Sequence, residues 1–194
     1  MFRNEEKDIY DEWMFLFNNQ KNIPTIDTVG HPRYDSTQKI IGKSIKINYN
    51  NYREEFYLVS KDNPIPILLA DGSMIFFDYV FDEDGTIVEH HLSYLPSPTE
   101  KDSLESTLSK IIRIDYEQEG FIPNVHSYTH LHSGKNSSYR FTVENIVYPL
   151  EFIAFIILTN YNHISEKIMN ELGKTHRSTL TEEEKGFFSL RIKR

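Results

Sequence analysis

The segment 128–141, "YTHLHSGKNSSYRF", carries two histidines one residue apart, then a turn-like run and an arginine. Alternate side chains of a β-strand point to the same face of the sheet. A strand over 125–132 therefore places a set of aromatic and imidazole side chains on one face: His126, Tyr128, His130 and His132. Imidazoles can transfer protons near neutral pH or bind a metal ion, so this face could support chemistry.

Two neighbouring strand patterns add charged residues to the same face. In "KIIRIDYE" (110–117) Arg113 and Asp115 alternate with isoleucines, and in "YRFTV" (139–143) Arg140 alternates with aromatic and apolar residues. Strand register is set by the face that must be buried. If the apolar sets share the core side, then Arg113, Asp115 and Arg140 lie on the histidine face.

A metal site is one interpretation of this face. His130 and His132 lie ~6.6 Å apart at a rise of ~3.3 Å per residue, which allows both to bind one divalent ion with bonds of ~2.1 Å. His126 is ~13 Å from His130 along a straight strand and cannot join them. A third ligand must come from a neighbouring strand, and Asp115 and His91 are the candidates.

A metal-free site for phosphoryl chemistry is a second interpretation. His130 and His132 would act as acid and base, Asp115 would orient an imidazole, and Arg140 would clamp a phosphate. Further residues are predicted to contact the ligand: Arg113, His126, Tyr128 and Lys135.

Two simpler interpretations stay open beside these. The segment "SGKNSS" (133–138) could offer backbone N–H groups to an anion or a partner without any chemistry. Alternatively, the face is a polar surface whose histidines have no function.

Two adjacent histidines in "EHHLSYLP" are expected to point in opposite directions. His90 alternates with apolar residues and is predicted to be a core histidine. His91 shares its face with Glu89 and Ser93 and could reach the site if its strand adjoins the others. A glycine precedes Lys43, as in a P-loop, but the other glycine of the P-loop motif is missing. A nucleotide site of that type is therefore excluded.

Composition narrows the class of protein. The chain has 194 residues, a net charge of −8 and no cysteine. The acidic balance argues against a general DNA-coating protein, although a local site for nucleic acid stays open. Without cysteine there can be no disulfides or thiolate metal sites, which fits a cytoplasmic protein. The most apolar stretch (150–161) is too short to span a bilayer, which needs ~20 residues.

The pattern of elements predicts an α+β protein in one domain spanning residues 1–194. An N-terminal helix is expected over 5–18, a sheet region over 43–143 and a helical C-terminal part over 148–194. The sheet is predicted to be antiparallel, with about 6–8 strands by the alternation rule.

Individual predictions follow from local patterns. Segment 22–36 is predicted to be loop, and "KSIKINY" (43–49) and "EEFYLVS" (54–60) to be strands. Asp71-Gly72 and Asp84-Gly85 are placed at hairpin turns. A short helix is expected within 96–106, a buried helix from Pro149, a second helix over 163–173 and a last short element over 181–192.

Several of these segments together resemble a bacterial family described only as a domain of unknown function. The resemblance covers roughly residues 86–162 and is carried by "HHLSYLPSP", "IIRIDYEQ", "HSYTHLHSG", "YRF" and "YPLEFIAFII". The resemblance implies that the motif residues of the family correspond to the following residues of this chain: Arg113, Asp115, Tyr116, His126, His130, His132, Arg140 and Pro149. Such families often lie near defence or toxin genes, which implies a cytoplasmic component of an antiviral or toxin-type system.

Two functional hypotheses follow. The first is a phosphodiesterase- or ribonuclease-type hydrolase whose His/Arg/Asp site acts on or binds RNA or a nucleotide. The second is a non-catalytic subunit that assembles with an ATPase or nuclease partner in a multi-component system. The second predicts an apolar patch on the terminal helices or within residues 49–57.

Overall fold

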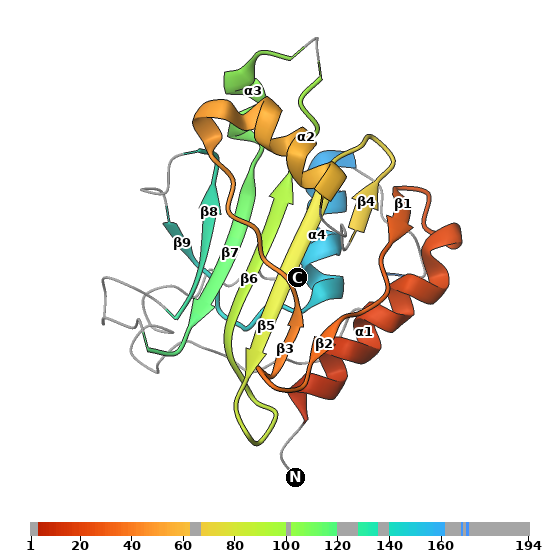
Figure 1. Cartoon of the computed structure of the whole chain (residues 1–194), viewed down its shortest axis with the longest axis vertical. Coiled ribbons are helices and arrows are strands. Elements are labelled where there is room, and N and C mark those ends of the chain that lie inside the picture. Colours follow the sequence, from red (N-terminus) through yellow and green to blue (C-terminus); the bar gives the residue numbers. More distant parts are fainter. Residues whose placement is uncertain are drawn as a thin grey trace, which may run out of the picture.

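The computed structural model describes residues 4–62, 67–99, 102–119, 128–135 and 140–161, together with Ile168 and Asn170. Over these residues the chain forms one antiparallel sheet of nine strands with helices packed on it (Figure 1). The sheet is open and the N-terminal and C-terminal helices lie against it, which confirms the predicted α+β class.

The central strands follow one another across the sheet in chain order. The strand order is β1-β4-β5-β6-β7-β8-β9, while β3 pairs with β2 and with β5. The strands are β1 (Ile26–Val29), β2 (Tyr34–Asp35), β3 (Ile40–Gly42), β4 (Ile67–Leu69), β5 (Met74–Phe81), β6 (Ile87–Leu95), β7 (Ile112–Glu117), β8 (Thr129–Ser133) and β9 (Arg140–Thr142). The helices are α1 (Glu5–Asn19), α2 (Tyr52–Asp62), α3 (Leu104–Ser109) and α4 (Pro149–Tyr161), with 3-10 turns η1 (Gln20–Asn22) and η2 (Tyr49–Asn51).

Local sequence chemistry explains the elements that were predicted correctly. Asn4 caps α1 by accepting a hydrogen bond from the Lys7 amide at 3.1 Å. Pro149 opens α4, where its missing N–H costs nothing. The turns on either side of β5 place Gly72 at φ +83° and Gly85 at φ +76°, a conformation that favours glycine.

Three predictions in the N-terminal half are wrong. The segment predicted to be loop, 22–36, contains β1 and β2. The segment 54–60 lies in α2, because Tyr52, Phe56 and Val59 are buried at helical spacing and its apolar run is too short to distinguish the two periods. The segment 43–48 forms no strand, and its alternation reflects side chains that pack on one side of an extended chain.

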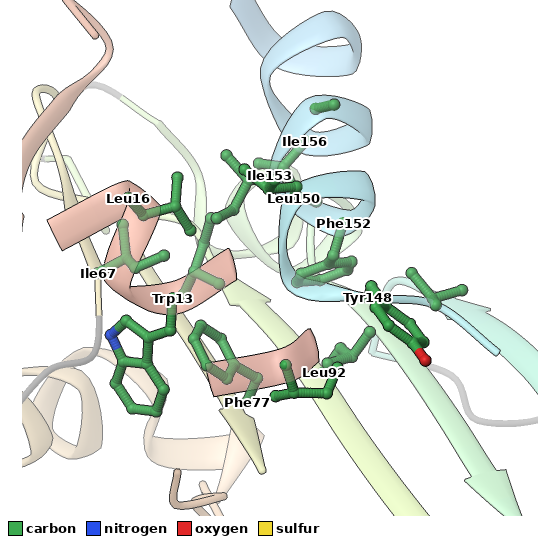
Figure 2. Packing of buried hydrophobic residues seen from close by; sticks show 14 of the residues in the cluster. Trp13, Leu16, Ile67, Phe77, Leu92, Tyr148, Leu150, Phe152, Ile153 and Ile156 are labelled. Atoms are coloured by element: carbon green, nitrogen blue, oxygen red, sulfur yellow. The ribbon is translucent and has the colours of Figure 1, made fainter. Parts of the chain in front are cut away.

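The larger core lies between one face of the sheet and the helices α1 and α4. Trp13 meets Phe77 edge-to-face at a centroid distance of 4.5 Å, and Leu16, Leu92 and Phe152 are buried in the same cluster (Figure 2). The strands and the two helices therefore together supply the apolar burial that stabilises the fold.

A smaller apolar cluster covers one end of the opposite face. Tyr52 and Phe56 of α2 pack there with Met74, Phe76 and Leu108. The chain that joins β3 to α2 crosses in front of the central strands in Figure 1, and Ile45, Ile47 and Tyr49 of this crossing segment (43–51) pack against the cluster.

Gly42 shows why a glycine precedes Lys43. Its φ is +94°, and a Cβ at this position would lie 2.1 Å from the Phe77 carbonyl oxygen. Because this close approach of β3 to β5 requires glycine, the residue has a packing role and not a phosphate-binding one.

The predicted helix over 163–173 and the element over 181–192 lie outside the described residues, apart from Ile168 and Asn170, which are helical. Of the helices that are described, none combines the length and the apolar character that crossing a membrane requires.

Candidate functional site

Two rows of side chains cross the face of the sheet opposite α1 and α4. The central row runs through directly paired residues of five strands: Asp78, His91, Asp115, His130 and Thr142. The neighbouring row runs in the same way through Phe76, Ser93, Arg113 and His132, and the backbone of Arg140 pairs with His132. The register therefore places Arg113, Asp115 and the two β8 histidines on one face, and the apolar sets on the other, as the alternation predicts.

Asp115 is the centre of the cluster that these rows form. Its Oδ2 accepts a hydrogen bond from Arg113 Nε at 2.7 Å, and its Oδ1 lies 3.2 Å from His91 Nδ1. We call His91, Arg113, Asp115, His130 and His132 the Asp115 cluster. His91 reaches the cluster because its strand, β6, is the direct neighbour of β7.

The two histidines of β8 face the same carboxylate oxygen. His132 Nε2 lies 3.4 Å and His130 Nε2 lies 3.8 Å from Asp115 Oδ2. The two imidazole rings meet nearly edge-to-face, with centroids 4.8 Å apart. Ligand atoms of Asp115, His130 and His132 all lie within 4.8 Å of one another, so these three residues could hold a metal ion.

The three residues at the centre of the cluster are buried. Asp115, His130 and His132 are 5%, 5% and 3% exposed. Burial by itself would raise the pKa of Asp115, but the adjacent His132 and His91 rings and the charge of Arg113 outweigh it and hold the pKa well below its usual range. Asp115 is therefore an anion at the core of a cationic shell.

His91 carries the positive charge on the side of the cluster away from β8. Its hydrogen bond to Asp115 is the main cause that raises its pKa to about 9, although burial opposes this. Its Nε2 lies 2.6 Å from Glu89 Oε1. Burial also raises the pKa of Asp78, its neighbour in the central row, to about 6. At neutral pH His91 is thus an imidazolium bridging Glu89 and Asp115.

The crossing segment covers part of this face. Burial raises the pKa of the Tyr49 hydroxyl, while the nearby charge of Arg113 lowers it, which places Tyr49 beside the cluster. Ser44 similarly interacts with Asp78. The Arg113 side chain keeps 37% of its surface exposed, so the cluster meets solvent on the Arg113 side.

The remaining predicted site residues are not all brought together. Tyr128 precedes β8 and packs against the larger core, so the alternation does not extend to it. Lys135 is exposed, and its Nζ donates to Asn50 Oδ1 at 3.3 Å. The backbone of Arg140 pairs with His132, while its side chain and the whole of His126 lie outside the described part of the chain.

Two grooves lie beside the cluster elements. One of about 730 Å³ is lined by Leu104, Leu108 and residues 133–135, and includes Lys135. The other, of about 870 Å³, is lined by Val88, Gln118 and three glutamates: Glu89, Glu117 and Glu119. Glu89 and Glu117 are direct cross-strand partners, so this groove repels anions.

Sequence reasoning missed three residues of the surroundings. Asp78 interrupts the apolar run "MIFFDYVF", and a charge in the middle of a buried strand could have identified it. Glu89 was noted only as sharing a face with His91. Tyr49 comes next to Arg113 through the path of the crossing segment, for which the sequence offers no local pattern.

The fold and the cluster define an α+β protein in which a histidine–carboxylate centre is built on neighbouring antiparallel strands. The chain belongs to the family of uncharacterized conserved proteins DUF2290, whose family model matches residues 16–192. The predicted resemblance to a family of unknown function is therefore confirmed. No curated protein and no solved structure matches the chain.

Proposed function

We propose that the protein is a hydrolase of the phosphodiesterase or ribonuclease type whose reaction centre is the Asp115 cluster. The observation that supports this most is the convergence of two buried imidazoles on one carboxylate oxygen, beside a guanidinium that is partly exposed. Imidazoles can move the protons of a nucleophile or a leaving group, and a guanidinium can bind a phosphate.

Each residue has a distinct role in this proposal. Arg113 anchors the phosphate, and Arg140, which is paired with His132 across β8 and β9, is the second clamp. His130 and His132 act on the attacking water, either as an acid–base pair or as metal ligands. Asp115 holds both imidazoles in position, since its two oxygens are fixed by Arg113 and His91.

Charge favours a short ligand. The chain carries a net charge of −8, and the groove beside Glu89 is acidic. A long nucleic acid would need many lysine and arginine contacts along its path. A nucleotide or the end of an RNA needs only a local cationic anchor, which Arg113 supplies.

The test is hydrolysis of a panel of nucleotides and short RNAs by the purified chain. His130→Asn and His132→Asn should lower kcat/KM more than about 100-fold, and Arg113→Lys should raise KM. An unrelated exposed histidine, in His31→Asn, is the matched control and should leave turnover unchanged. Turnover that survives in both β8 variants would reject the proposal.

A binding subunit is the second candidate. Tyr57 and Leu58 of α2 are 61% and 55% exposed, within or next to the segment where an apolar patch was predicted. In this alternative the chain assembles with an ATPase or nuclease and has no activity alone. The double variant Tyr57→Ser/Leu58→Ser should then no longer co-purify with a partner protein whose gene neighbours that of the chain. An unchanged complex would reject the alternative.

The wider setting stays a prediction from the resemblance. If the protein belongs to a cytoplasmic antiviral system, host cells that express the intact chain with its neighbouring genes should survive phage infection. If it belongs to a toxin-type system, such cells should arrest growth. The variant His132→Asn should remove that phenotype if the cluster carries the activity.

A further inference from the structure

We propose that Asp115, His130 and His132 bind one divalent transition-metal ion of the zinc type. The carboxylate would bind through Oδ2 and each histidine through Nε2. The inference deepens the proposed function, because it names the cofactor of the same site and rests on that site being the functional one.

The geometry of the two strands brings the three ligand atoms together. His130 and His132 are two residues apart on one face of β8, and Asp115 is the direct partner of His130 on β7. An ion with bonds of ~2.1 Å in tetrahedral arrangement keeps its ligand atoms ~3.4 Å apart. The distances of 3.4 and 3.8 Å to Asp115 Oδ2 match this spacing within a few tenths of an ångström.

The donor set selects the class of ion. Two imidazole nitrogens and one carboxylate oxygen suit Zn²⁺ and its first-row neighbours, whereas Ca²⁺ and Mg²⁺ prefer oxygen ligands alone. Three protein ligands leave a coordination position for water, which is the pattern of catalytic and not of structural zinc sites.

The carboxylate already has the outer partners that a metal ligand needs. Arg113 Nε holds Oδ2 and His91 Nδ1 holds Oδ1, and such contacts orient a ligating carboxylate. Asp78 and Glu89 lie next to His91 in the sheet and offset the positive charge of this shell. A dication would therefore not enter a purely cationic environment.

A buried ion-pair network without metal explains less of the arrangement. Arg113 Nε already pairs with Oδ2 of Asp115, and His91 Nδ1 lies against Oδ1. Two further buried histidines are not needed to neutralise this carboxylate. Both ring nitrogens of His132 are buried without a hydrogen-bond partner among the described residues, and a metal bond at Nε2, which faces Oδ2 at 3.4 Å, would satisfy one of them.

The experiment uses the full chain, purified without a polyhistidine tag and stripped with a chelator. Co²⁺ is then titrated while its visible d–d absorption is recorded, and Zn²⁺ binding is measured by calorimetry. The native chain should bind one ion per chain. His132→Asn and Asp115→Asn should weaken binding at least about 100-fold, since a lost ligand costs more than a lost outer contact.

His31→Asn is the matched control, because His31 is exposed and distant in sequence from all three ligands. Its affinity for Co²⁺ should equal that of the native chain. Absence of binding to the native chain, or equal affinity in His132→Asn, would overturn the proposal, provided that the variants show a native circular dichroism spectrum.

Hydrolysis assays on the same samples separate this inference from the proposed function. Metal binding without hydrolysis of any phosphoester supports the metal site and rejects the hydrolase. Hydrolysis that persists in chelator and still requires His132 rejects the metal site and supports an acid–base pair.

Discussion

His90 and His91 are adjacent in β6, and they show how differently the two faces of the sheet treat the same side chain. His90 is fully buried between the rings of Tyr79 and Tyr116, and burial lowers its pKa to about 3. His91 points to the other face, where its hydrogen bond to Asp115 helps to raise its pKa to about 9. One histidine is held neutral and the other is held charged.

The difference separates a core from a site. On the His90 face, apolar side chains pack against α1 and α4, and two buried carboxylates of α1, Glu5 and Glu12, each accept a backbone N–H. On the His91 face, the smaller apolar cluster covers one end, and the buried charged and imidazole side chains lie around one carboxylate, Asp115. Burial of charge costs free energy that burial of apolar surface does not, so the His91 face is poorly explained by stability alone.

The largest expected effect is on the apolar face. Phe77→Ala removes a fully buried ring that contacts Trp13, and should lower the free energy of unfolding by about 3–5 kcal/mol. Phe141 belongs to the same cross-strand row but is 58% exposed, so Phe141→Ala should cost less than about 0.5 kcal/mol. Urea unfolding measures both, and equal losses would contradict the assignment of this face as the core.

His91→Gln tests the charged face. A group whose pKa is higher in the folded than in the unfolded chain stabilises the folded state. This stabilisation is complete below the unfolded pKa and is lost as the pH rises through the folded pKa. The variant should therefore be less stable by about 2–3 kcal/mol at pH 6, and the difference should vanish above pH 9. Unfolding is followed in chelator across this range. A difference that grows with pH would contradict the charged state of His91.

His90→Gln should show the opposite dependence. The unfolded chain takes up a proton below about pH 6.5 while the folded chain does so only near pH 3, so His90 destabilises the native fold as pH falls. The native chain should lose up to about 1.4 kcal/mol per pH unit relative to the variant in this window. For each variant, the stability of the native chain minus that of the variant is plotted against pH. The slope of this difference must be negative for His91→Gln and positive for His90→Gln. Slopes of equal sign would refute the contrast between the faces.

Lys135→Ala should have the smallest effect. The side chain is exposed and contacts Asn50 only through a bond of 3.3 Å, so stability should change by less than about 0.5 kcal/mol. Ligand affinity should fall less than in Arg113→Lys. A larger fall would place Lys135 in the binding site after all, as the sequence predicted.

The alternation predicts which residues of β7 and β8 share a face better than it predicts the elements around them. Alternation in strands β7 and β8 correctly places Asp115, His130 and His132 on one face, because register follows from which side is apolar. The same rule fails for α2, where Phe56 and Val59 fit both periods. Burial of the cluster depends on the crossing segment, whose path is set by tertiary packing that no local pattern encodes.

The central claim is that the Asp115 cluster on the His91 face binds a metal ion. X-ray absorption at the zinc edge on the Zn²⁺-loaded full chain tests it most directly. The account predicts two imidazole nitrogens and one carboxylate oxygen at about 2.0–2.2 Å, with one imidazole lost in His132→Asn. A spectrum without imidazole ligands, or one that His132→Asn leaves unchanged, would contradict it.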